Sequence, residues 1–324
     1  MDKLESSLIT VVIPYFNQAN LIESVLLQHL NQSLPPHEII VVDDGSTDDG
    51  IKRIKNLQNK YSTIRIERIK KNMGVNAAIN RGLSLVRSPF VKISACDDLV
   101  EPNLLEISVS ILIQHPQAAF SFSFPGEYFP KTGKKYAFPL NLSRRPLYLS
   151  PSELVSILRK RCFTFPSNSC VFRTAALRDV GLFRAYLELG ADWFACFAMA
   201  FRYGICFLPQ NLTWFCIRKD SYSATGLKDK KRQLETLRQI LDLILEPQFR
   251  ELKYCFKKSA VIYEYSFHTL IFLLKNHQYY SLLSFKLFTR LIIRGTWSYI
   301  RRTLSINRRQ KINVLRNWIY GETL

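Results

Sequence analysis

The chain has 324 residues, of which 47% are hydrophobic, and a formal net charge of +19. This length exceeds the usual size of one domain, and the apolar content allows a substantial buried core. The positive charge favours an anionic partner, which can be a nucleotide diphosphate, a phospholipid surface or a nucleic acid. Much of the excess lies in residues 228–324, where 19 Lys or Arg stand against 7 Asp or Glu.

Membrane signals and disulfides are not expected. The first five residues are rich in charge, so no signal peptide is predicted. The apolar segments near Phe194 and Ile271 are interrupted by Arg202 and Lys275 before they reach the roughly 18 residues that a spanning helix needs. The seven cysteines include no CxxC pair, so we expect free thiols in a reducing cytoplasm and a soluble or peripheral protein.

Residues 8–124 alternate short β-branched segments with helical patterns, which is typical of a parallel sheet with crossover helices. Such a doubly wound α/β sheet binds its ligand at the carboxyl ends of the strands. The predicted strands are Leu8–Pro14, Glu38–Val42, Ile64–Arg68, Phe90–Ser94 and Ala118–Phe124. The predicted helices are Leu21–Asn31, Asp48–Lys60, Val75–Val86 and Asn103–His115.

The rest of the chain is less regular. Residues 126–150 have no clear period, which indicates a long loop or a hairpin, either over the site or on the plain surface. Long amphipathic helices are expected from Lys228 onward, so we divide the chain into a domain of residues 1–224 and a basic, mainly helical extension of residues 225–324. Between them we predict strands Asn168–Phe172, Ile205–Leu208 and Leu212–Ile217, a helix from Thr174 and a helix Asp192–Tyr203.

Two adjacent carboxylates, Asp43 and Asp44, follow the second predicted strand. They suit hydrogen bonds from a ribose hydroxyl or a base N–H, while Gly45 permits a tight turn. An ordinary acidic loop before a helix is the alternative. No GxGxxG follows the first strand, where residues 14–18 read Pro-Tyr-Phe-Asn-Gln, so a nicotinamide or flavin dinucleotide is not expected and a mononucleotide remains.

A second carboxylate pair, Asp97 and Asp98, follows the fourth predicted strand. Mn²⁺ or Mg²⁺ bound to a nucleotide diphosphate needs only one or two protein carboxylates, because phosphates and water complete its coordination. A cap for the helix that follows Pro102 is the alternative.

Several segments, in order and spacing, resemble family-2 glycosyltransferases, and the resemblance covers roughly residues 7–224. It implies a GT-A type fold: a doubly wound, mostly parallel sheet flanked by helices, here with a C-terminal helical extension. The first four segments are Thr10–Asn17, Val41–Asp48, Asn72–Leu83 and Ser94–Leu104. The later ones are Pro166–Arg173, Val180–Phe183 and Gly190–Phe194.

The resemblance also implies a reaction, in which a sugar moves from a nucleotide diphosphate to an acceptor hydroxyl with inversion at the anomeric carbon. UDP is the default nucleotide, and GDP and dTDP sugars are used in the same family. Asp192, which opens a helix, is implied as the general base, because a hydroxyl is a poor nucleophile until its proton is removed. Without the family, a helix N-cap is the simpler interpretation of Asp192.

The implied cofactor is Mn²⁺ or Mg²⁺, held by Asp97, whose charge would neutralise the leaving diphosphate. The residues expected to bind the nucleotide sugar are Pro14, Tyr15, Asn17, Asp43, Asp44, Asn72, Gly74, Asn76, Asp97, Asp98 and Arg218.

Four positions depart from the family pattern. Ala95 stands where the first Asp of a D-x-D triplet is usual, and Ala191 replaces an acidic residue that often precedes the base. Ile79 replaces a common Arg, and Arg218 stands where a His commonly contacts metal or diphosphate. A guanidinium there suits direct diphosphate binding. If the departures abolish catalysis, the chain is a nucleotide-sugar-binding partner subunit.

The basic tail indicates a membrane surface. Lys286, Arg290, Arg294 and Arg301 share one helical ridge, which suits an anionic membrane interface where lipid-linked acceptors reside. A packed bundle with a solvated charged face is the alternative. We therefore expect a glycan or lipid-linked acceptor, a peripheral location at the inner face of the plasma membrane, and a role in cell-surface polysaccharide or glycolipid assembly.

Two other functional classes are less favoured. Nucleic-acid binding is not expected, because the predicted cleft is acidic and no nucleic-acid-binding motif occurs. A nucleotidyltransferase would share the mononucleotide fold, but it usually has a Gly-rich, basic phosphate loop after the first strand, and residues 14–18 contain none.

Overall fold

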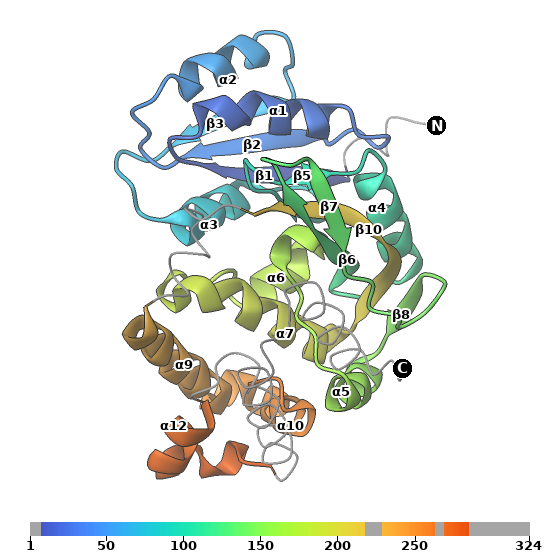
Figure 1. The fold of residues 1–324 in the computed structure, drawn as a ribbon, viewed down its shortest axis with the longest axis vertical. Helices are drawn as coiled ribbons and strands as arrows, with labels where there is room; N and C mark the ends of the chain where they lie inside the picture. The colour runs from blue at the N-terminus through green and yellow to red at the C-terminus, as the bar shows by residue number, and fades with distance from the viewer. Residues whose placement is uncertain (1–7, 218–228, 263–268, 285–324) are drawn as a thin grey trace. The chain divides into compact units, whose positions relative to one another are not determined.

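The computed structural model describes residues 8–217, 229–262 and 269–284 (Figure 1). Arg218 and the ridge of Lys286, Arg290, Arg294 and Arg301 lie outside these residues. Within the described residues the chain forms two compact units, one of residues 8–150 and 165–217 and the other of residues 151–164, 229–262 and 269–284. The sequence predicted a single boundary between residues 224 and 225; the structure adds residues 151–164 to the C-terminal unit.

The first unit is built on a sheet of ten strands within the described residues, and four neighbouring strands form its parallel half in the order β3-β2-β1-β4 (Figure 1). Segments such as Val11–Ile13 and Ile39–Val42 are fully buried, as expected when both faces of a parallel sheet are covered. The four strands are β1 (Ile9–Tyr15), β2 (Glu38–Asp43), β3 (Ile64–Arg68) and β4 (Phe90–Ile93).

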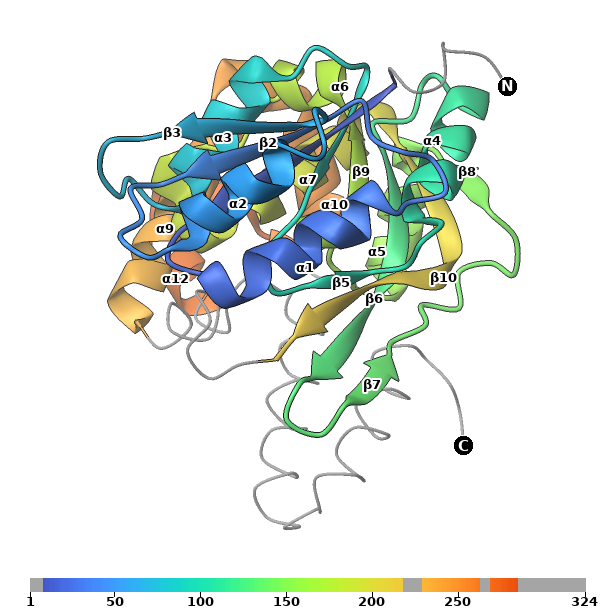
Figure 2. The same cartoon turned by 90° about the horizontal axis from the view of Figure 1, so that it is seen from above.

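Helices cover both faces of this half. α1 and α2 pack against each other on one face, whereas α3 packs on β1 and β2 from the other face (Figures 1 and 2). Gly82 lets α3 approach closely, because a Cβ there would lie 2.4 Å from the Val12 side chain. The three helices are α1 (Ala19–Leu30), α2 (Gly50–Gln58) and α3 (Val75–Leu85).

The other strands extend the sheet. β9 (Cys170–Arg173) lies antiparallel between β4 and β6 (Phe120–Phe129), and β6 is parallel to β10 (Ile205–Cys216). β7 (Lys134–Ala137) forms a hairpin with β6, so the hairpin predicted as one option for residues 126–150 is present. Two short strands, β5 (Leu99–Val100) and β8 (Leu147–Leu149), pair antiparallel with β10.

Helical elements complete the first unit. α4 packs on β6, β9 and β10, and α7 packs against α6. Ten of the residues of α7 from Ala191 to Phe201 are buried, so the helix lies within the core. The elements are α4 (Leu104–Gln114), α6 (Thr174–Asp179), α7 (Ala191–Tyr203) and two 3₁₀ segments, η2 (Ser167–Ser169) and η3 (Ala185–Gly190).

The described part of the second unit is helical. α5 packs against α10, and α10 packs against α9. Leu154 and Leu158 of α5 and Leu252 and Phe256 of α10 are buried at i, i+4 spacing, as in amphipathic helices. The elements are α5 (Pro151–Lys160), α9 (Lys230–Leu245), η4 (Pro247–Phe249), α10 (Arg250–Ser259), α12 (Thr269–Lys275) and η5 (His277–Leu282).

The predicted α/β fold class, with a mostly parallel doubly wound core, is confirmed. Two details differ. α5 was not predicted, and the two strands predicted within residues 205–217 form a single strand, β10, whose register shifts after Leu208. None of the helices in the part of the chain that the structure describes is long and apolar enough to cross a membrane.

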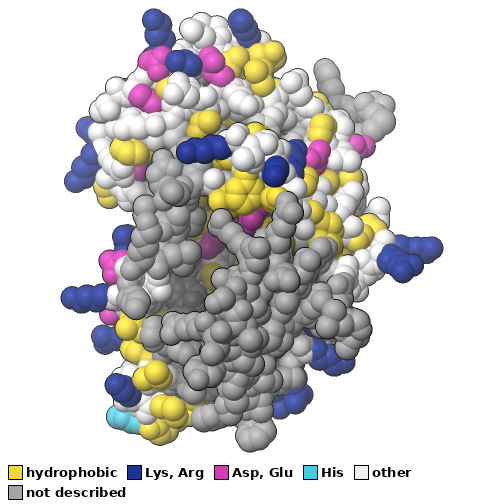
Figure 3. Space-filling view, viewed as in Figure 1, with side chains coloured by type: hydrophobic (Ala, Val, Ile, Leu, Met, Phe, Trp, Pro, Cys, Tyr) yellow, Lys and Arg dark blue, Asp and Glu magenta, His cyan; other side chains and the backbone are white. Residues whose placement is uncertain are grey.

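The surface over α1, α2 and β3 carries both signs of charge. Lys and Arg side chains stand among Asp and Glu at this end of the unit (Figure 3). Arg53 lies 3.0 Å from Asp49, and Arg65 lies 3.4 Å from Glu38. Such exposed pairs contribute little to stability, and their mixture gives no one-sided patch for an anionic partner.

Gly50, the first residue of α2, makes room for Tyr15. A Cβ at residue 50 would lie 1.6 Å from the Tyr15 hydroxyl oxygen. Although alanine favours a helix, we expect Gly50→Ala to lower the free energy of unfolding by about 1–3 kcal/mol through overpacking, as measured by urea denaturation. In a Tyr15→Leu background the same change should lose most of its cost. An equal cost in both backgrounds would show that this close approach is not the cause.

Candidate active site

Three segments meet where parallel strands end. The carboxyl ends of β1, β2 and β4 are neighbours, and they lead into residues 14–17, 43–48 and 94–98. The Cys96 thiol donates to the carbonyl of Pro14 at 3.5 Å, which joins the first and third segments. Most of the predicted nucleotide-sugar residues therefore share one edge of the sheet.

Asn17 joins the loop after β1 to the loop after β2. Its backbone is left-handed (φ 49°), and its amide N–H donates to Ser46 Oγ at 3.0 Å. Its side-chain oxygen accepts from the N–H groups of Thr47 (2.9 Å) and Asp48 (3.3 Å). Asn17, which is predicted to bind the ligand, is exposed, and its hydrogen bonds also connect the two loops.

Asp48 binds a strand and two helices together. The Tyr15 hydroxyl donates to Oδ1 at 2.5 Å, Gly50 N to Oδ1 at 3.2 Å and Ala19 N to Oδ2 at 2.9 Å. Burial alone would raise the pKa of Asp48, but these three hydrogen bonds hold it below its usual value. Asp48 therefore remains ionised at neutral pH and closes the first turns of α1 and α2.

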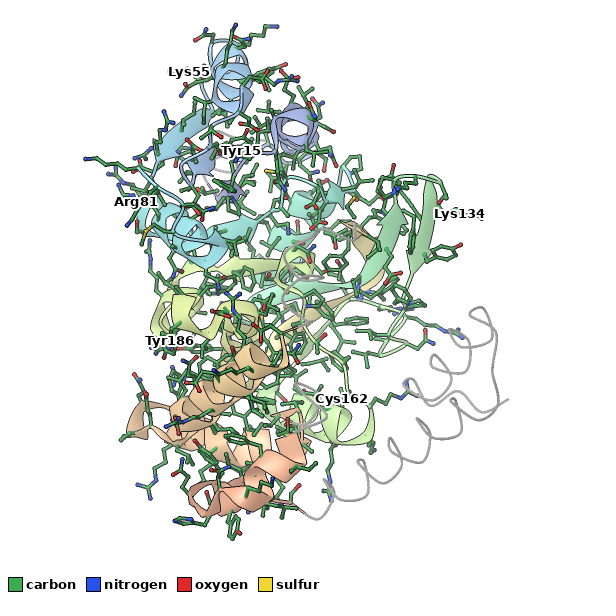
Figure 4. All side chains as sticks on the ribbon, turned by 60° about the vertical axis from the view of Figure 1, so that its left-hand side comes forward. Tyr15, Lys55, Arg81, Lys134, Cys162 and Tyr186 are labelled. Atoms are coloured by element: carbon green, nitrogen blue, oxygen red, sulfur yellow. The ribbon has the colours of Figure 1, made fainter. Side chains whose placement is uncertain are left out.

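Tyr15 points into the interior beside α1 and α2, unlike the outward Lys55 on α2 (Figure 4). Its side chain is 1% exposed. Burial, and then the neighbouring Asp48 carboxylate, raise the pKa of Tyr15, so the phenol stays protonated and donates. The structure therefore gives Tyr15 a supporting position, while the following residue, Phe16, is 41% exposed at the same edge.

Asp43 and Asp44 are both buried, and their side chains hold different loops. Asp43 accepts from Ser46 N at 2.9 Å and pairs with Arg68 Nε at 3.0 Å. Asp44 accepts from the N–H groups of Met73 and Gly74, each at 2.8 Å, one on each carboxylate oxygen. We call the three segments of residues 14–17, 43–48 and 94–98 the rim, and both aspartates hold its shape. Direct contact of either aspartate with a nucleotide stays a prediction.

Gly45 and Gly74 meet backbone demands at this rim. Gly45 has φ +78°, and a Cβ there would lie 2.9 Å from Lys71 Cα. Gly74 has φ +91° before α3 and is exposed, with no atom within 4 Å of a Cβ position. Asn72, also exposed, accepts from Gly74 N at 2.9 Å. These residues leave open space next to the Asp44 loop.

Asn76 in the first turn of α3 faces the segment before α7. Its Nδ2 donates to the carbonyl of Glu188 at 2.8 Å. Glu188 has φ 49° and ψ −117°, a conformation that is costly for a residue with a side chain. Asn80, one turn later, bonds both backbone groups of Phe183, so α3 fastens this segment at two points.

Asp97 and Asp98 differ in their surroundings. Asp97 is partly exposed, whereas Asp98 is 8% exposed. Asp98 accepts from Asn168 Nδ2 on one oxygen and from Cys216 N, at 3.1 Å, on the other. Burial, and then the Asp97 carboxylate, raise the pKa of Asp98 to about 6. Asp98 is therefore a held carboxylate, and Asp97 is the one that reaches solvent.

A divalent cation fits this donor set. Among the described residues no three His, Cys, Asp or Glu side chains form a metal cluster. The edge instead offers one partly exposed carboxylate, Asp97, backed by Asp98. Mg²⁺ and Mn²⁺ accept such sparse protein ligation when phosphates and water complete the coordination, so the residues present suit an ion that arrives with a diphosphate.

Two fully buried basic side chains lie behind the carboxylates. Lys92 Nζ donates to the carbonyls of Ile93, at 2.9 Å, and Asn168. Burial lowers the pKa of Lys92 to about 8. Burial, and then Lys92, lower the pKa of His29 to about 3, so the ring is neutral beside Ser94 Oγ at 2.8 Å. The sequence analysis singled out neither residue.

Asp192 lies in the first turn of α7. Ser167 Oγ donates to Oδ2 at 3.1 Å, and Trp193 N donates to Oδ1 at 2.7 Å. Burial raises the pKa of Asp192, although these hydrogen bonds act in the opposite direction. A carboxylate with a raised pKa is a stronger proton acceptor than an ordinary aspartate, which suits a general base.

The structure brings together the predicted residues that it describes, and it adds residues that the sequence analysis missed. The side-chain donors to Asp98 and Asp192 are two consecutive residues, Asn168 and Ser167. Both lie in a segment that the resemblance covered, but no motif marked their side chains. Arg218 cannot be placed, because it lies outside the described residues.

The departures Ile79 and Ala191 are core positions. Ile79 is 7% exposed and Ala191 is 1% exposed. Each therefore fills its place with an apolar side chain, and neither places a charge at the rim. Ala95 follows β4 and is partly exposed, and it places a methyl group two residues before Asp97.

Comparisons with known families and curated proteins identify sequences similar to this chain. A family model described as Glycosyl transferase family 2 matches residues 10–181. The cholesterol galactosyltransferase of Borreliella burgdorferi is 37% identical over 99 residues, 31% of this chain and 27% of that protein. The chondroitin synthase of Pasteurella multocida is 31% identical over 100 residues, 31% of this chain and 10% of that protein. The matches thus span less than half of these relatives.

Solved structures show the same fold at low identity. S. aureus TarS residues 1–349, in complex with UDP, superimposes with a TM-score of 0.60 at 18% identity, over 83% of this chain and 75% of that one. The mannosyltransferase PcManGT from Pyrobaculum calidifontis, in complex with GDP-Man and Mn²⁺, gives 0.56 at 16% identity, over 96% and 84%. The GT-A type fold predicted from the sequence is confirmed.

Proposed function

The chain belongs to glycosyl transferase family 2, and on that basis we propose that it transfers a sugar from a nucleoside diphosphate to an acceptor hydroxyl. The observation that carries the proposal is the presence of two carboxylates with different properties in one unit. Asp97 reaches solvent at the sheet edge, and Asp192 has a raised pKa at the start of α7. Ser167 donates a hydrogen bond to Asp192, and the next residue, Asn168, donates one to Asp98, which is adjacent to Asp97.

In the proposed mechanism Asp192 accepts the proton of the acceptor hydroxyl while that oxygen attacks the anomeric carbon. The bond between the anomeric carbon and the diphosphate oxygen breaks on the face opposite to the attacking oxygen, so the nucleoside diphosphate leaves and the anomeric configuration is inverted. Ser167 and Trp193 N orient the two Asp192 oxygens before the proton arrives. Mn²⁺ or Mg²⁺, held by Asp97, would stabilise the charge of the diphosphate.

For the donor, we propose UDP as the first nucleotide to test. One TarS structure contains UDP, another contains UDP-GlcNAc, and the PcManGT structure contains GDP-Man, so the fold accommodates either base. In this chain, exposed Asn17, Asn72 and Gly74 and partly exposed Pro14 and Asn76 surround the rim and are proposed to contact the donor. Buried Tyr15, Asp43, Asp44 and Asp98 are proposed to hold that rim.

For the acceptor, we propose a glycan or a lipid-linked sugar. The names of the relatives support this class, since one is a cholesterol galactosyltransferase and another a chondroitin synthase. We further propose that the chain works peripherally at the cytoplasmic face of the membrane in cell-surface glycan or glycolipid assembly, with the basic residues of 228–324 meeting anionic lipid.

The direct test is turnover of UDP-, GDP- and dTDP-sugars by the purified chain with Mn²⁺ or Mg²⁺, followed as nucleoside diphosphate release. Release with one nucleotide class, increased by added glycan or lipid-linked acceptors, would support the proposal. Release of pyrophosphate from a nucleoside triphosphate and a sugar phosphate would instead identify a nucleotidyltransferase. Nucleotide binding without release would identify a binding subunit.

The raised pKa of Asp192 predicts where activity is lost in acid. Asp192 must be ionised to accept a proton, so kcat/KM should fall as the pH drops through its raised pKa, a higher pH than for an ordinary aspartate. Ser167 donates to the charged form, so Ser167→Ala should move this acid limb to still higher pH. Ser84→Ala removes an exposed hydroxyl bonded to Arg81 O and should leave the limb in place. A limb that moves to lower pH in Ser167→Ala would contradict Asp192 as the base.

A further inference from the structure

The turn η2 stands between the two carboxylates of the proposed reaction. Its first residue, Ser167, donates to Asp192 Oδ2 at 3.1 Å. Its second residue, Asn168, donates through Nδ2 to Asp98 Oδ2. Consecutive side chains of one short turn therefore hold the proposed base and the carboxylate beside Asp97.

The turn itself is fastened from three strands. Lys92 of β4 donates to the carbonyl of Asn168, and Ser123 of β6 donates to the carbonyl of Ser169 at 3.5 Å. Ser169 Oγ and Thr213 Oγ1 of β10 lie 2.8 Å apart. Asp98 is also held by Cys216 N of β10, so the turn and the carboxylate share a neighbouring strand.

Lys92 is an unusual choice for a core position, because burying an ammonium is costly. Its hydrogen bonds to the carbonyls of Ile93 and Asn168 compensate part of that cost. An apolar side chain would pack there at a lower free-energy cost. The position is therefore explained by what the ammonium holds, which is the carbonyl of Asn168.

The Asn168 side chain has one hydrogen-bonding task in the described structure. Its Oδ1 is buried with no hydrogen-bond partner there, while its Nδ2 binds Asp98. Leaving a buried amide oxygen unbonded costs free energy. The orientation of the amide therefore favours the hydrogen bond to Asp98 over a hydrogen bond to its own oxygen.

We infer that Asn168, anchored through its carbonyl by Lys92, is a positioning residue that sets Asp98 against Asp97 and, through the adjacent Ser167, sets both relative to Asp192. The inference deepens the proposed transferase function and rests on it. Asn168 acts through other residues: it fixes the metal-side carboxylates and keeps their distance from the base constant. Partners that orient metal ligands in this way typically matter about 10–100-fold for metal affinity or activity.

The test compares Asn168→Ala and Asn168→Asp with the control Asn211→Ala. Asn211 is a partly buried asparagine in β10 whose Nδ2 donates to the carbonyls of Phe124 and Thr213, so its loss removes similar hydrogen bonds without touching Asp98 or Asp192. For each protein, the Tm, the Kd for Mn²⁺ with UDP, GDP and dTDP by calorimetry, and kcat and KM are measured.

Asn168→Ala should weaken Mn²⁺-dependent binding of the nucleotide that the wild type binds, and lower kcat/KM, each about 10–100-fold. Asn168→Asp keeps the shape but places a carboxylate against Asp98, so its nucleotide affinity should fall at least as far. Asn211→Ala should show a comparable change in Tm with nucleotide affinity within about twofold of the wild type.

The outcomes separate the inference from the function beneath it. If the wild type binds a nucleotide and both Asn168 variants bind it as the wild type does, the positioning role is wrong and the transferase proposal stands. The positioning role is equally wrong if Asn211→Ala loses as much affinity as Asn168→Ala. If the wild type binds no nucleotide with Mn²⁺, the proposed function fails and the inference fails with it.

Discussion

Asp192→Asn should lower kcat about 10³-fold and leave the Kd for the nucleotide donor unchanged. The amide preserves the shape of the side chain and can still meet Ser167, but it cannot take the proton of the attacking hydroxyl. The general-base contribution is of this order in enzymes that rely on a positioned carboxylate. The two values come from steady-state release of nucleoside diphosphate and from calorimetry with the nucleotide alone.

Asp179→Asn is the matched control for this variant. Asp179 is the last residue of α6, and its Oδ2 accepts hydrogen bonds from Arg202 and Tyr203. The variant therefore removes a carboxylate at the surface of the same unit. Its kcat should stay within about twofold of the wild type, as is usual for a substitution remote from the site. Should Asp192→Asn retain wild-type kcat, another residue is the base, or the chain does not catalyse the transfer.

Asp97→Ala should abolish the metal-dependent part of nucleotide binding, a loss of roughly 100-fold or more. Asp97 is the partly exposed carboxylate at the end of β4, and a divalent ion supplies several kcal/mol of charge stabilisation to a diphosphate. Calorimetry with UDP, GDP and dTDP, with and without Mn²⁺, measures this part as the difference between the two conditions.

The control for Asp97→Ala is Asp49→Ala, which removes an exposed carboxylate paired with Arg53 outside the rim. Its nucleotide affinity should match that of the wild type. If metal-dependent binding survives Asp97→Ala, the metal ligand is Asp98 or a residue outside the described part of the chain. If the wild type binds the nucleotide without any metal, the cofactor is removed from the proposal.

The parallel half of the sheet was predictable because its signals are local. Ile64–Arg68 was predicted with the bounds that the structure shows, β2 and β4 differ by one residue at their carboxyl ends, and β1 is shifted by one residue at both ends. Apolar β-branched segments alternate there with amphipathic helices, so periodicity and strand length agree. A resemblance over the same residues then ordered the motifs along the sheet edge.

Other elements depend on distant residues and could not be predicted this way. The buried face of α5, Leu154 and Leu158, packs on α10, which lies about a hundred residues later in the chain. In β10, Pro209 and Gln210 interrupt the strand pattern, yet β6 continues to pair on both sides of the register shift. Long-range pairing overrides local preference in both cases.

In the candidate site, the sequence predicted the carboxylates but not the hydrogen bonds that hold them. For Asp44, contact with a ribose or a base stays a prediction; the structure adds that its oxygens accept from the N–H groups of Met73 and Gly74, which adjacent residues could not reveal. Lys92 was overlooked because a single lysine in a short strand is typical of an exposed edge. In the structure β9 pairs with β4 on the side away from β1, so β4 is an inner strand and not an edge.

The Asp48 carboxylate has a consequence for how a donor would be received. The same two oxygens hold the first turn of α1, the first turn of α2 and the end of β1, so the loop after β1 is tied to the loop after β2. Asn17 adds a second tie across them. An incoming nucleotide then meets a rim with its shape already set, so little of its binding energy is spent on ordering that rim.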